Sequence, residues 1–184
     1  RNTGGIVIAA KTAEALRILN QKIRDREIEK TYLCIVHGRP HPAEGVLEGY
    51  LFKDAKQNRV YVRDTPVPGA KTAVTRYRTL RRKGGLSLME CTLVTGRTHQ
   101  IRAQFAHAGC PLLGDGKYGS ARADRPYGEQ RGQALYAYRL RFAFTTDAGS
   151  LSYLNGKQFQ VPHVPFAERY FDWDTGSAAS AEKE

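Results

Sequence analysis

Short β-branched and aromatic runs follow one another closely along the middle of this chain, and they constrain its fold more than any other feature. They lie at residues 46–52, 59–63, 71–80 and 86–94, and Gly, Pro, Asn or Lys-Gly-Gly separates them. Such spacing predicts strands joined by tight turns. Residues 71–78 also alternate in character, which indicates a strand with one wetter face. We therefore expect an antiparallel meander at the centre of the chain.

Further strands are predicted on both sides of this meander, at residues 4–10, 31–37, 135–144 and 158–161. The first is expected to be buried because Ile6, Val7 and Ile8 stand together between glycines and a Lys-Thr pair that can cap a helix. Together with three helices, these strands predict the α+β class: a mixed, mainly antiparallel sheet with flanking helices.

The first of the three predicted helices follows Thr12, with Leu16, Leu19 and Ile23 on its inner face and a basic outer surface that includes Lys22. The other two are short, at 99–108 before Gly109 and at 165–173. We expect one domain over residues 1–174, followed by a disordered tail at 175–184, where Ser, Ala, Glu and Lys show no periodicity.

The charge balance favours a polyanionic partner. Lys and Arg number 29 against 18 Asp and Glu, which gives a formal net charge of +11, and this favours nucleic acid over an anionic membrane. No apolar run is long enough to span a membrane, and we expect no signal or transit peptide. Three widely spaced cysteines, Cys34, Cys91 and Cys110, are expected to be buried thiols in a reducing compartment. We therefore expect a cytoplasmic protein without a metal.

The segment Thr95-Gly96-Arg97-Thr98-His99-Gln100-Ile101-Arg102 carries the densest chemistry. A glycine-bearing loop that leads into a helix offers backbone N–H groups and a favourable dipole to an anion, and Arg97 would add a bidentate clamp. The other interpretation is an ordinary turn capped by Thr98, with Arg97 solvated and His99 bonded to backbone. The residues alone leave both open.

Residues 96–102 of this segment, together with Phe105, Ala108, Gly109, residues 112–115 and Tyr118-Gly119, resemble the signature of RluA-type RNA pseudouridine synthases. Other blocks match in the same order. The opening 1–11 resembles the segment directly after the catalytic aspartate of the family's His-Arg-Leu-Asp motif, and Lys30-Thr31-Tyr32 resembles its tyrosine motif. Residues 70–77 and 135–140 also fit, so the resemblance covers roughly residues 1–170.

The resemblance implies an enzyme without a cofactor or metal that flips a uridine out of ribosomal or transfer RNA and isomerises it to pseudouridine. Tyr32 would pack on the base, and Arg102 would pair with the catalytic aspartate. A fixed guanidinium is what a carboxylate in a water-poor pocket needs to stay ionised. The expected RNA-binding residues are Arg1, Lys30, Arg97, Thr98, His99 and Gln100. A monomer is expected.

The sequence departs from the family pattern at its start. The catalytic aspartate is expected immediately before Arg1, so the chain is expected to be a catalytic domain without its N-terminal part and inactive alone. Gly4 replaces the family's usual serine, a change expected to matter little. Asp115 is expected to cap a turn or hold Arg97. Two alternatives remain: a noncatalytic RNA-binding relative, and a small hydrolase that uses His99 with a carboxylate.

Overall fold

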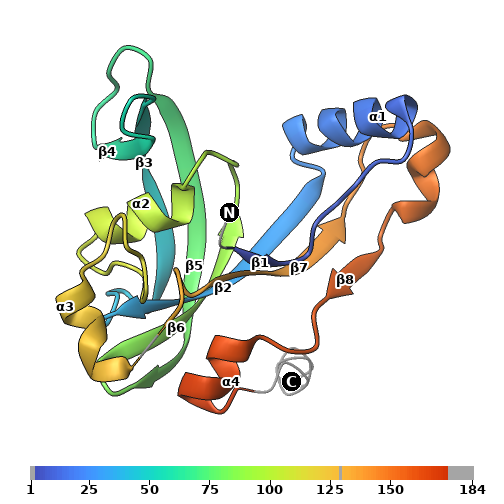
Figure 1. The fold of residues 1–184 in the computed structure, drawn as a ribbon. Coiled ribbons are helices and arrows are strands. Elements are labelled where there is room, and N and C mark those ends of the chain that lie inside the picture. The colour runs from blue at the N-terminus through green and yellow to red at the C-terminus, as the bar shows by residue number, and fades with distance from the viewer. Residues whose placement is uncertain (1–2, 129, 174–184) are drawn as a thin grey trace.

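The computed structural model describes residues 3–128 and 130–173, in which a mixed sheet organises the fold (Figure 1). Its strands are β1 (Gly4–Gly5), β2 (Ile28–His37), β3 (Glu44–Asp54), β4 (Arg59–Arg63), β5 (Lys71–Lys83), β6 (Leu86–Leu93), β7 (Leu135–Phe142) and β8 (Gln158–Gln160). They are ordered β1-β7-β2-β6-β5-β3-β4, and β8 pairs with β7. Within the described residues β1 and β7 pair in parallel, and the other neighbours are antiparallel. The predicted α+β class is confirmed.

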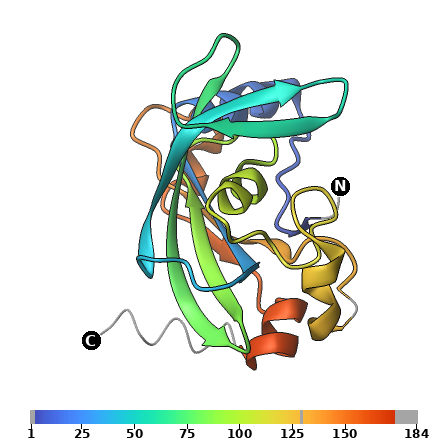
Figure 2. The same ribbon diagram turned by 90° about the vertical axis from the view of Figure 1, so that its left-hand side faces the viewer.

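The central strands occur where they were predicted, but they are not ordered as a simple meander. β3 and β4 form a hairpin, and β5 turns back to pair with the other side of β3. The first part of β3, Glu44 to Leu51, pairs with β5, and its end, Tyr50 to Asp54, pairs with β4. The short β4 therefore lies at the edge of the sheet, where the hairpin projects from the body of the molecule (Figure 2).

Four α-helices lie beside this sheet in the described residues: α1 (Ala13–Arg24), α2 (Gln100–His107), α3 (Ala121–Asp124) and α4 (Pro165–Phe171). The three predicted helices are α1, α2 and α4, and each is confirmed. Thr12 caps α1 by accepting a hydrogen bond from Ala15 N at 3.1 Å, and Gly109, at φ 77°, follows the end of α2. The helix α3 and the 3-10 helices η1 (Arg125–Tyr127) and η2 (Gly149–Leu154) were not predicted.

The predicted faces of α1 are only partly correct. Leu19 is buried as expected, but Leu16 and Ile23 are 53% and 40% exposed. Lys22, predicted on the outer basic surface, is buried instead, because its Nζ is 2.6 Å from the carboxylate of Glu27. Its long stem lets the lysine fill the space below the helix while the ammonium is paired.

The prediction of a buried strand over residues 4–10 is mostly wrong. Only Gly4 and Gly5 form a strand, and Ile6 N donates one more bond to Ala137 O. From Arg139 onward the outer edge of β7 pairs with β8, so the segment after Ile6 has no strand beside it. Val7 consequently points outward and is 85% exposed.

The core lies on both faces of the sheet, as the alternation of β2 shows. Cys34 and Val36 pack with Ile101 and Phe105 of α2 on one face. On the other face, alternate residues of β2 pack with α4. Cys34 and Cys91 are buried as expected, whereas Cys110 is partly exposed. No helix among the described residues is long and apolar enough to cross a membrane, and the predicted tail at 175–184 lies outside them.

Candidate functional site

Tyr32 lies near the middle of the sheet, in a row of residues that reaches the N-terminal strand. It pairs with Cys91 of β6 on one side and Ala137 of β7 on the other, and Ala137 also pairs with Gly5. Its side chain packs against the apolar cluster that contains Ile101 of α2. Burial raises the pKa of the Tyr32 hydroxyl, which therefore stays protonated at neutral pH. Tyr32 thus lies on the α2 face and is separated from β1 by β7 alone.

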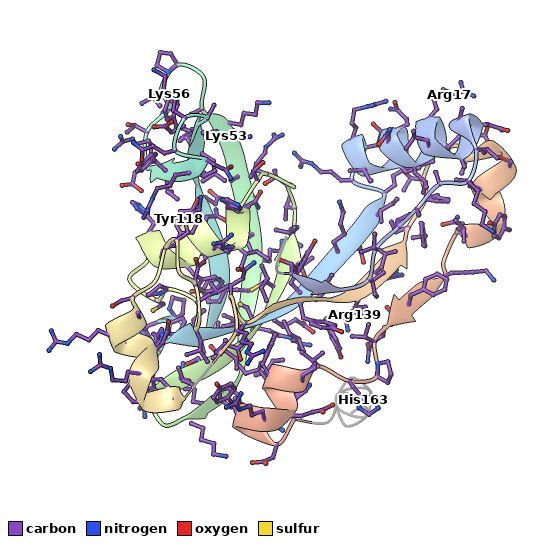
Figure 3. All side chains as sticks on the ribbon, in the orientation of Figure 1. Arg17, Lys53, Lys56, Tyr118, Arg139 and His163 are labelled. Carbon is purple, nitrogen blue, oxygen red and sulfur yellow. The ribbon has the colours of Figure 1, made fainter. Side chains whose placement is uncertain are left out.

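A pocket of about 210 Å³ opens beside Tyr32. Its polar lining residues are Lys30, Thr31, Tyr32 and Arg139, and its apolar ones are Ile6, Ile8, Ile23, Ala137 and Leu140. Figure 3 shows Arg139 near the middle of the molecule, on β7. Burial lowers the pKa of the Lys30 ammonium. An aromatic ring, two cationic side chains and an apolar wall suit a base with its phosphate. Two predicted site residues, Lys30 and Tyr32, therefore line one pocket.

The loop before α2 is organised by the side chain of Gln100. Its Oε1 accepts hydrogen bonds from Arg97 N at 2.9 Å and Thr95 Oγ1 at 2.8 Å. Its Nε2 donates to Val74 O at 3.0 Å and Thr75 Oγ1 at 2.9 Å. Gln100 is only 3% exposed. Of the predicted RNA-binding residues, this one is thus turned inward and fixes the loop to β5.

The other residues of this loop lie at the surface. Arg97 and Thr98 are exposed, and Arg97 Nε donates to Thr72 O at 3.2 Å. The residue before the first turn of α2 is His99, which has φ 54° and makes no side-chain capping bond. The alternative of a turn capped by Thr98 is therefore wrong. Arg97, Thr98 and the start of α2 remain available to an external anion.

Arg102 and Asp115 form a bidentate ion pair. Arg102 Nε donates to Oδ2 and Nη2 to Oδ1, each at 2.7 Å. Asp115 is fully buried, and its Oδ1 also accepts from the backbone N–H groups of Lys117 and Tyr118, so it caps a turn as predicted. Burial alone would raise the pKa of Asp115, but these bonds outweigh it and lower the pKa. The prediction that Asp115 holds Arg97 is wrong, because its partner is Arg102.

Tyr118 forms a cluster that the sequence did not indicate. Its hydroxyl accepts a hydrogen bond from Val60 N at 2.8 Å and lies 3.0 Å from His99 Nδ1. The guanidinium groups of Arg59 and Arg102 lie over its ring at 5.1 and 5.2 Å from the centroid. Burial, followed by the charge of Arg102, lowers the pKa of His99, so the imidazole is neutral at pH 7. A tyrosine in a loop and an arginine in β4 have no local signal that could link them.

Two loop contacts connect the Arg102 pair with the start of β1. Gly114, next to Asp115, has φ 72°, and a Cβ there would lie 2.3 Å from Gly132 O, so the two loops are in close contact. Gln133 follows Gly132 in the chain, and its Nε2 lies 3.5 Å from Thr3 Oγ1. The structure therefore brings Tyr32, Lys30, the loop before α2 and Arg102 to one side of the sheet. Arg1 lies outside the described residues.

Comparison with known proteins agrees with this arrangement. A family model described as RNA pseudouridylate synthase matches residues 1–107. An uncharacterized RNA pseudouridine synthase of Chlorobaculum parvum is 36% identical over 165 residues, which cover 82% of this chain and 50% of that protein. The ribosomal large subunit pseudouridine synthase D of Neisseria meningitidis is 33% identical, covering 83% of this chain and 42% of its own.

A third relative, ribosomal large subunit pseudouridine synthase C of Escherichia coli, is 34% identical over 68% of this chain and 39% of its own length. The chain thus spans about half the length of such relatives or less. Human RNA Pseudouridylate Synthase Domain Containing 1 has a similar fold, with a TM-score of 0.70 and 18% identity over 94% of this chain and 72% of its own. This chain belongs to the RNA pseudouridylate synthase family and is of the RluA type.

Proposed function

We propose that this chain is the greater part of a catalytic domain that isomerises a specific uridine in RNA to pseudouridine. The reaction breaks the bond between C1′ and N1, turns the base and joins C1′ to C5; C5 then loses its proton and N1 gains one. The observation that supports this function best is the pocket beside Tyr32, because Lys30 and Arg139 line it together with an aromatic ring that lies on the same face as α2.

In this proposal Tyr32 stacks on the flipped uracil and keeps its hydroxyl proton available for transfer. Arg102 orients the catalytic carboxylate. Its bonds to Asp115 use Nε and Nη2, which leaves Nη1 for a second acceptor. Asp115 itself is a poor nucleophile, because it is fully buried and both of its oxygens accept bonds from Arg102.

The exposed side chains of the loop, Arg97 and Thr98, would hold RNA phosphates, with His99 and Lys30 beside them. Gln100 would act indirectly by fixing this loop. Relatives named for the ribosomal large subunit make ribosomal RNA the first substrate to test, with transfer RNA as the second. We also propose a cytoplasmic monomer, since a net charge of +11 opposes self-association.

The test uses the chain extended upstream by His-Arg-Leu-Asp and the strand that precedes this motif in the family. The extended protein is incubated with ribosomal and transfer RNA transcripts tritiated at C5 of uridine, and released tritium is counted. Release that disappears when the added aspartate is replaced by asparagine would support the proposal. RNA binding without release from either RNA would instead favour a noncatalytic relative.

A further inference from the structure

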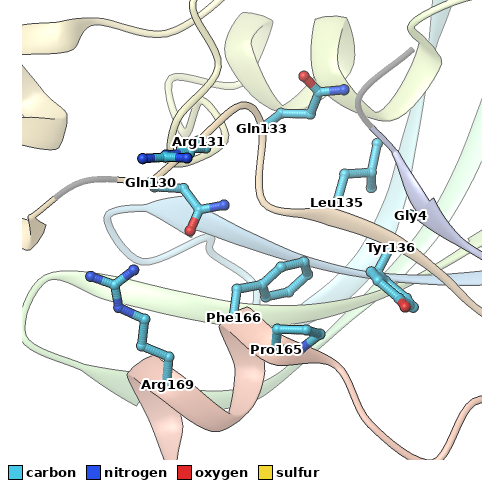
Figure 4. Close-up of a pocket in the computed structure, with 9 residues that line it drawn as sticks. All are labelled: Gly4, Gln130, Arg131, Gln133, Leu135, Tyr136, Pro165, Phe166 and Arg169. Carbon is cyan, nitrogen blue, oxygen red and sulfur yellow. The ribbon is translucent and has the colours of Figure 1, made fainter.

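A second pocket lies at the β1 edge of the sheet and shares no lining residue with the pocket beside Tyr32 (Figure 4). Its volume is about 260 Å³. The apolar and aromatic lining residues are Leu135, Tyr136, Pro165 and Phe166, the polar ones are Gln130, Arg131, Gln133 and Arg169, and Gly4 completes it. The residues proposed for catalysis and those of the loop before α2 do not line it.

The aromatic wall of this pocket depends on Gly4. A Cβ at Gly4 would lie 2.5 Å from Cε2 of Tyr136, so the tyrosine ring occupies the space that any other residue at position 4 would fill. A side chain at position 4 would therefore displace this ring, while the expectation that glycine there matters little stays a prediction. The Tyr136 ring also meets Phe166 edge to face, with centroids 6.3 Å apart. This contact and Gly4 hold the ring at the wall of the pocket while it remains partly exposed.

The polar side of the pocket carries two amides and two guanidinium groups. Gln133 Nε2 lies 3.5 Å from Thr3 Oγ1, and Gln130 Nε2 is 3.3 Å from Gly132 O. Arg131 and Arg169 are exposed at the rim, and Figure 4 shows both on the side opposite Tyr136. Each arginine already interacts with another group, so the pocket offers positive potential rather than a vacant ion-pair partner.

This combination suits an unpaired nucleotide better than a bare anion. A flat ring gives a base a surface to stack on, an amide can both donate to and accept from the base edge, and a guanidinium suits a phosphate. A bare phosphate would leave the aromatic wall unused. The Tyr136 ring packs on the α4 face of the sheet, whereas Tyr32 lies on the α2 face, so this pocket and the proposed active site lie on opposite faces.

We infer that this pocket binds an unpaired nucleotide of the substrate RNA, at a distance from the target uridine, with its base against Tyr136 and its phosphate near Arg131 and Arg169. The inference rests on the proposed function and deepens it. The pocket would help the enzyme choose its site, because a base paired at that position could not enter it.

The experiment measures the fluorescence of single-stranded heptaribonucleotides that contain one 2-aminopurine, titrated with the 184-residue chain. We expect the emission to be quenched on binding, since the base stacks on Tyr136. Tyr136→Leu should abolish most of the quenching and weaken affinity about 5- to 100-fold, whereas Tyr136→Phe should behave like the parent. Gly4→Ala, which displaces the ring, should resemble Tyr136→Leu. Tyr153→Leu is the matched control, because Tyr153 is 67% exposed in η2, away from the pocket.

Two further probes separate a nucleotide from an anion: an oligonucleotide abasic at the probe position, and inorganic phosphate as a competitor. Abasic RNA that binds as tightly as the parent oligonucleotide, or phosphate that displaces both equally, would overturn the inference in favour of an anion site. Unchanged quenching in Tyr136→Leu would also overturn it and leave the proposed function intact. Failure of the parent chain and the Tyr153→Leu control to bind any RNA would overturn the inference alone, because the proposed function is tested separately with the upstream-extended chain.

Discussion

Arg102 is held as a rigid fork by Asp115, and its proposed role depends on that geometry. Two bonds of 2.7 Å fix the plane of the guanidinium. Lysine would keep the charge but could not hold both oxygens and reach a second acceptor. In the upstream-extended chain we expect Arg102→Lys to slow tritium release by about tenfold or more. RNA affinity should change by less than about twofold, because phosphate contacts elsewhere dominate binding. Single-turnover release and filter binding measure the two effects.

Arg102→Ala should abolish turnover, but it also leaves the buried Asp115 carboxylate unpaired, which typically costs about 3–5 kcal/mol of stability. Asp115→Asn is the matched control, since it breaks the ion pair and keeps Arg102. If Asp115→Asn loses activity at unchanged stability, the guanidinium orientation that Asp115 fixes is required, and full activity in Asp115→Asn would show that Arg102 acts without this support. Turnover retained in Arg102→Ala would contradict its assigned role directly.

Glu27 determines part of the dependence of the free energy of unfolding on pH in the acid range. Its carboxylate is bonded to Lys22 and to the hydroxyls of Thr145 and Thr146, and these bonds lower its pKa from 4.5 to about 2. The unfolded chain therefore binds this proton more tightly than the folded one. The stabilisation is complete above the unfolded value of 4.5 and is lost as the pH falls toward the folded value of about 2. We expect urea unfolding to show a falling free energy of unfolding across this window.

The control for this prediction is the double variant Lys22→Met, Glu27→Gln, which removes the carboxylate without leaving a buried ammonium unpaired. Its free energy of unfolding should fall less steeply with acid than that of the parent over the same window. If the free energy of unfolding fell equally steeply with pH in the two proteins, Glu27 would not be the cause of the acid sensitivity.

At the scale of elements, the loop between β6 and α2 depends on one buried amide. Gln100 bonds the loop through Thr95 and Arg97 and bonds β5 through Val74 and Thr75. Gln100→Ala leaves buried polar groups without partners, so we expect a loss of about 1–3 kcal/mol in the free energy of unfolding. RNA affinity should also fall, because Arg97 is no longer held. Urea unfolding and filter binding measure both quantities.

Thr98→Ala is the matched control in the same loop, because Thr98 is exposed. It should change the free energy of unfolding by less than about 0.5 kcal/mol. Any loss of RNA affinity in this variant would then report a direct contact rather than a loosened loop. Equal stabilities of Gln100→Ala and Thr98→Ala would contradict the role assigned to Gln100.

Local sequence patterns predicted the positions of the helices and strands well, but they predicted poorly which strands pair with one another. Alternation and turn residues placed β2 through β7 and the helices α1, α2 and α4, because these signals act within a few residues. They could not place β4 at the sheet edge or end the first strand at Gly5, since both depend on which distant strand occupies the edge. The site shows the same limit: the family motif indicated Arg102 and Tyr32, but only the fold joins Arg102 to Asp115 and Tyr118 to Arg59.

At the scale of the whole molecule, two projections near opposite ends of the central sheet carry basic side chains. Lys53 and Lys56 lie on the β3–β4 hairpin, and Arg17 lies on α1, as Figure 3 shows. The face with Tyr32 and α2 lies between these two projections (Figure 1). A folded RNA seated on this face could therefore be held at both ends by phosphate contacts, while the central pocket takes the target nucleotide.

This arrangement predicts how RNA binding depends on salt. Each lysine that neutralises a phosphate adds roughly 0.7 to the slope of log affinity against log salt for single-stranded RNA. We expect Lys53→Gln, Lys56→Gln to weaken binding of every RNA tested by a similar factor and to reduce this slope by about 0.7 to 1.4. Lys157→Gln, an exposed lysine beside β8, is the control and should leave the slope unchanged. Filter binding between about 50 and 200 mM salt measures the slopes. A slope unchanged in the hairpin variant would mean that the RNA does not reach the hairpin, and the binding face would then have to be sought nearer α1.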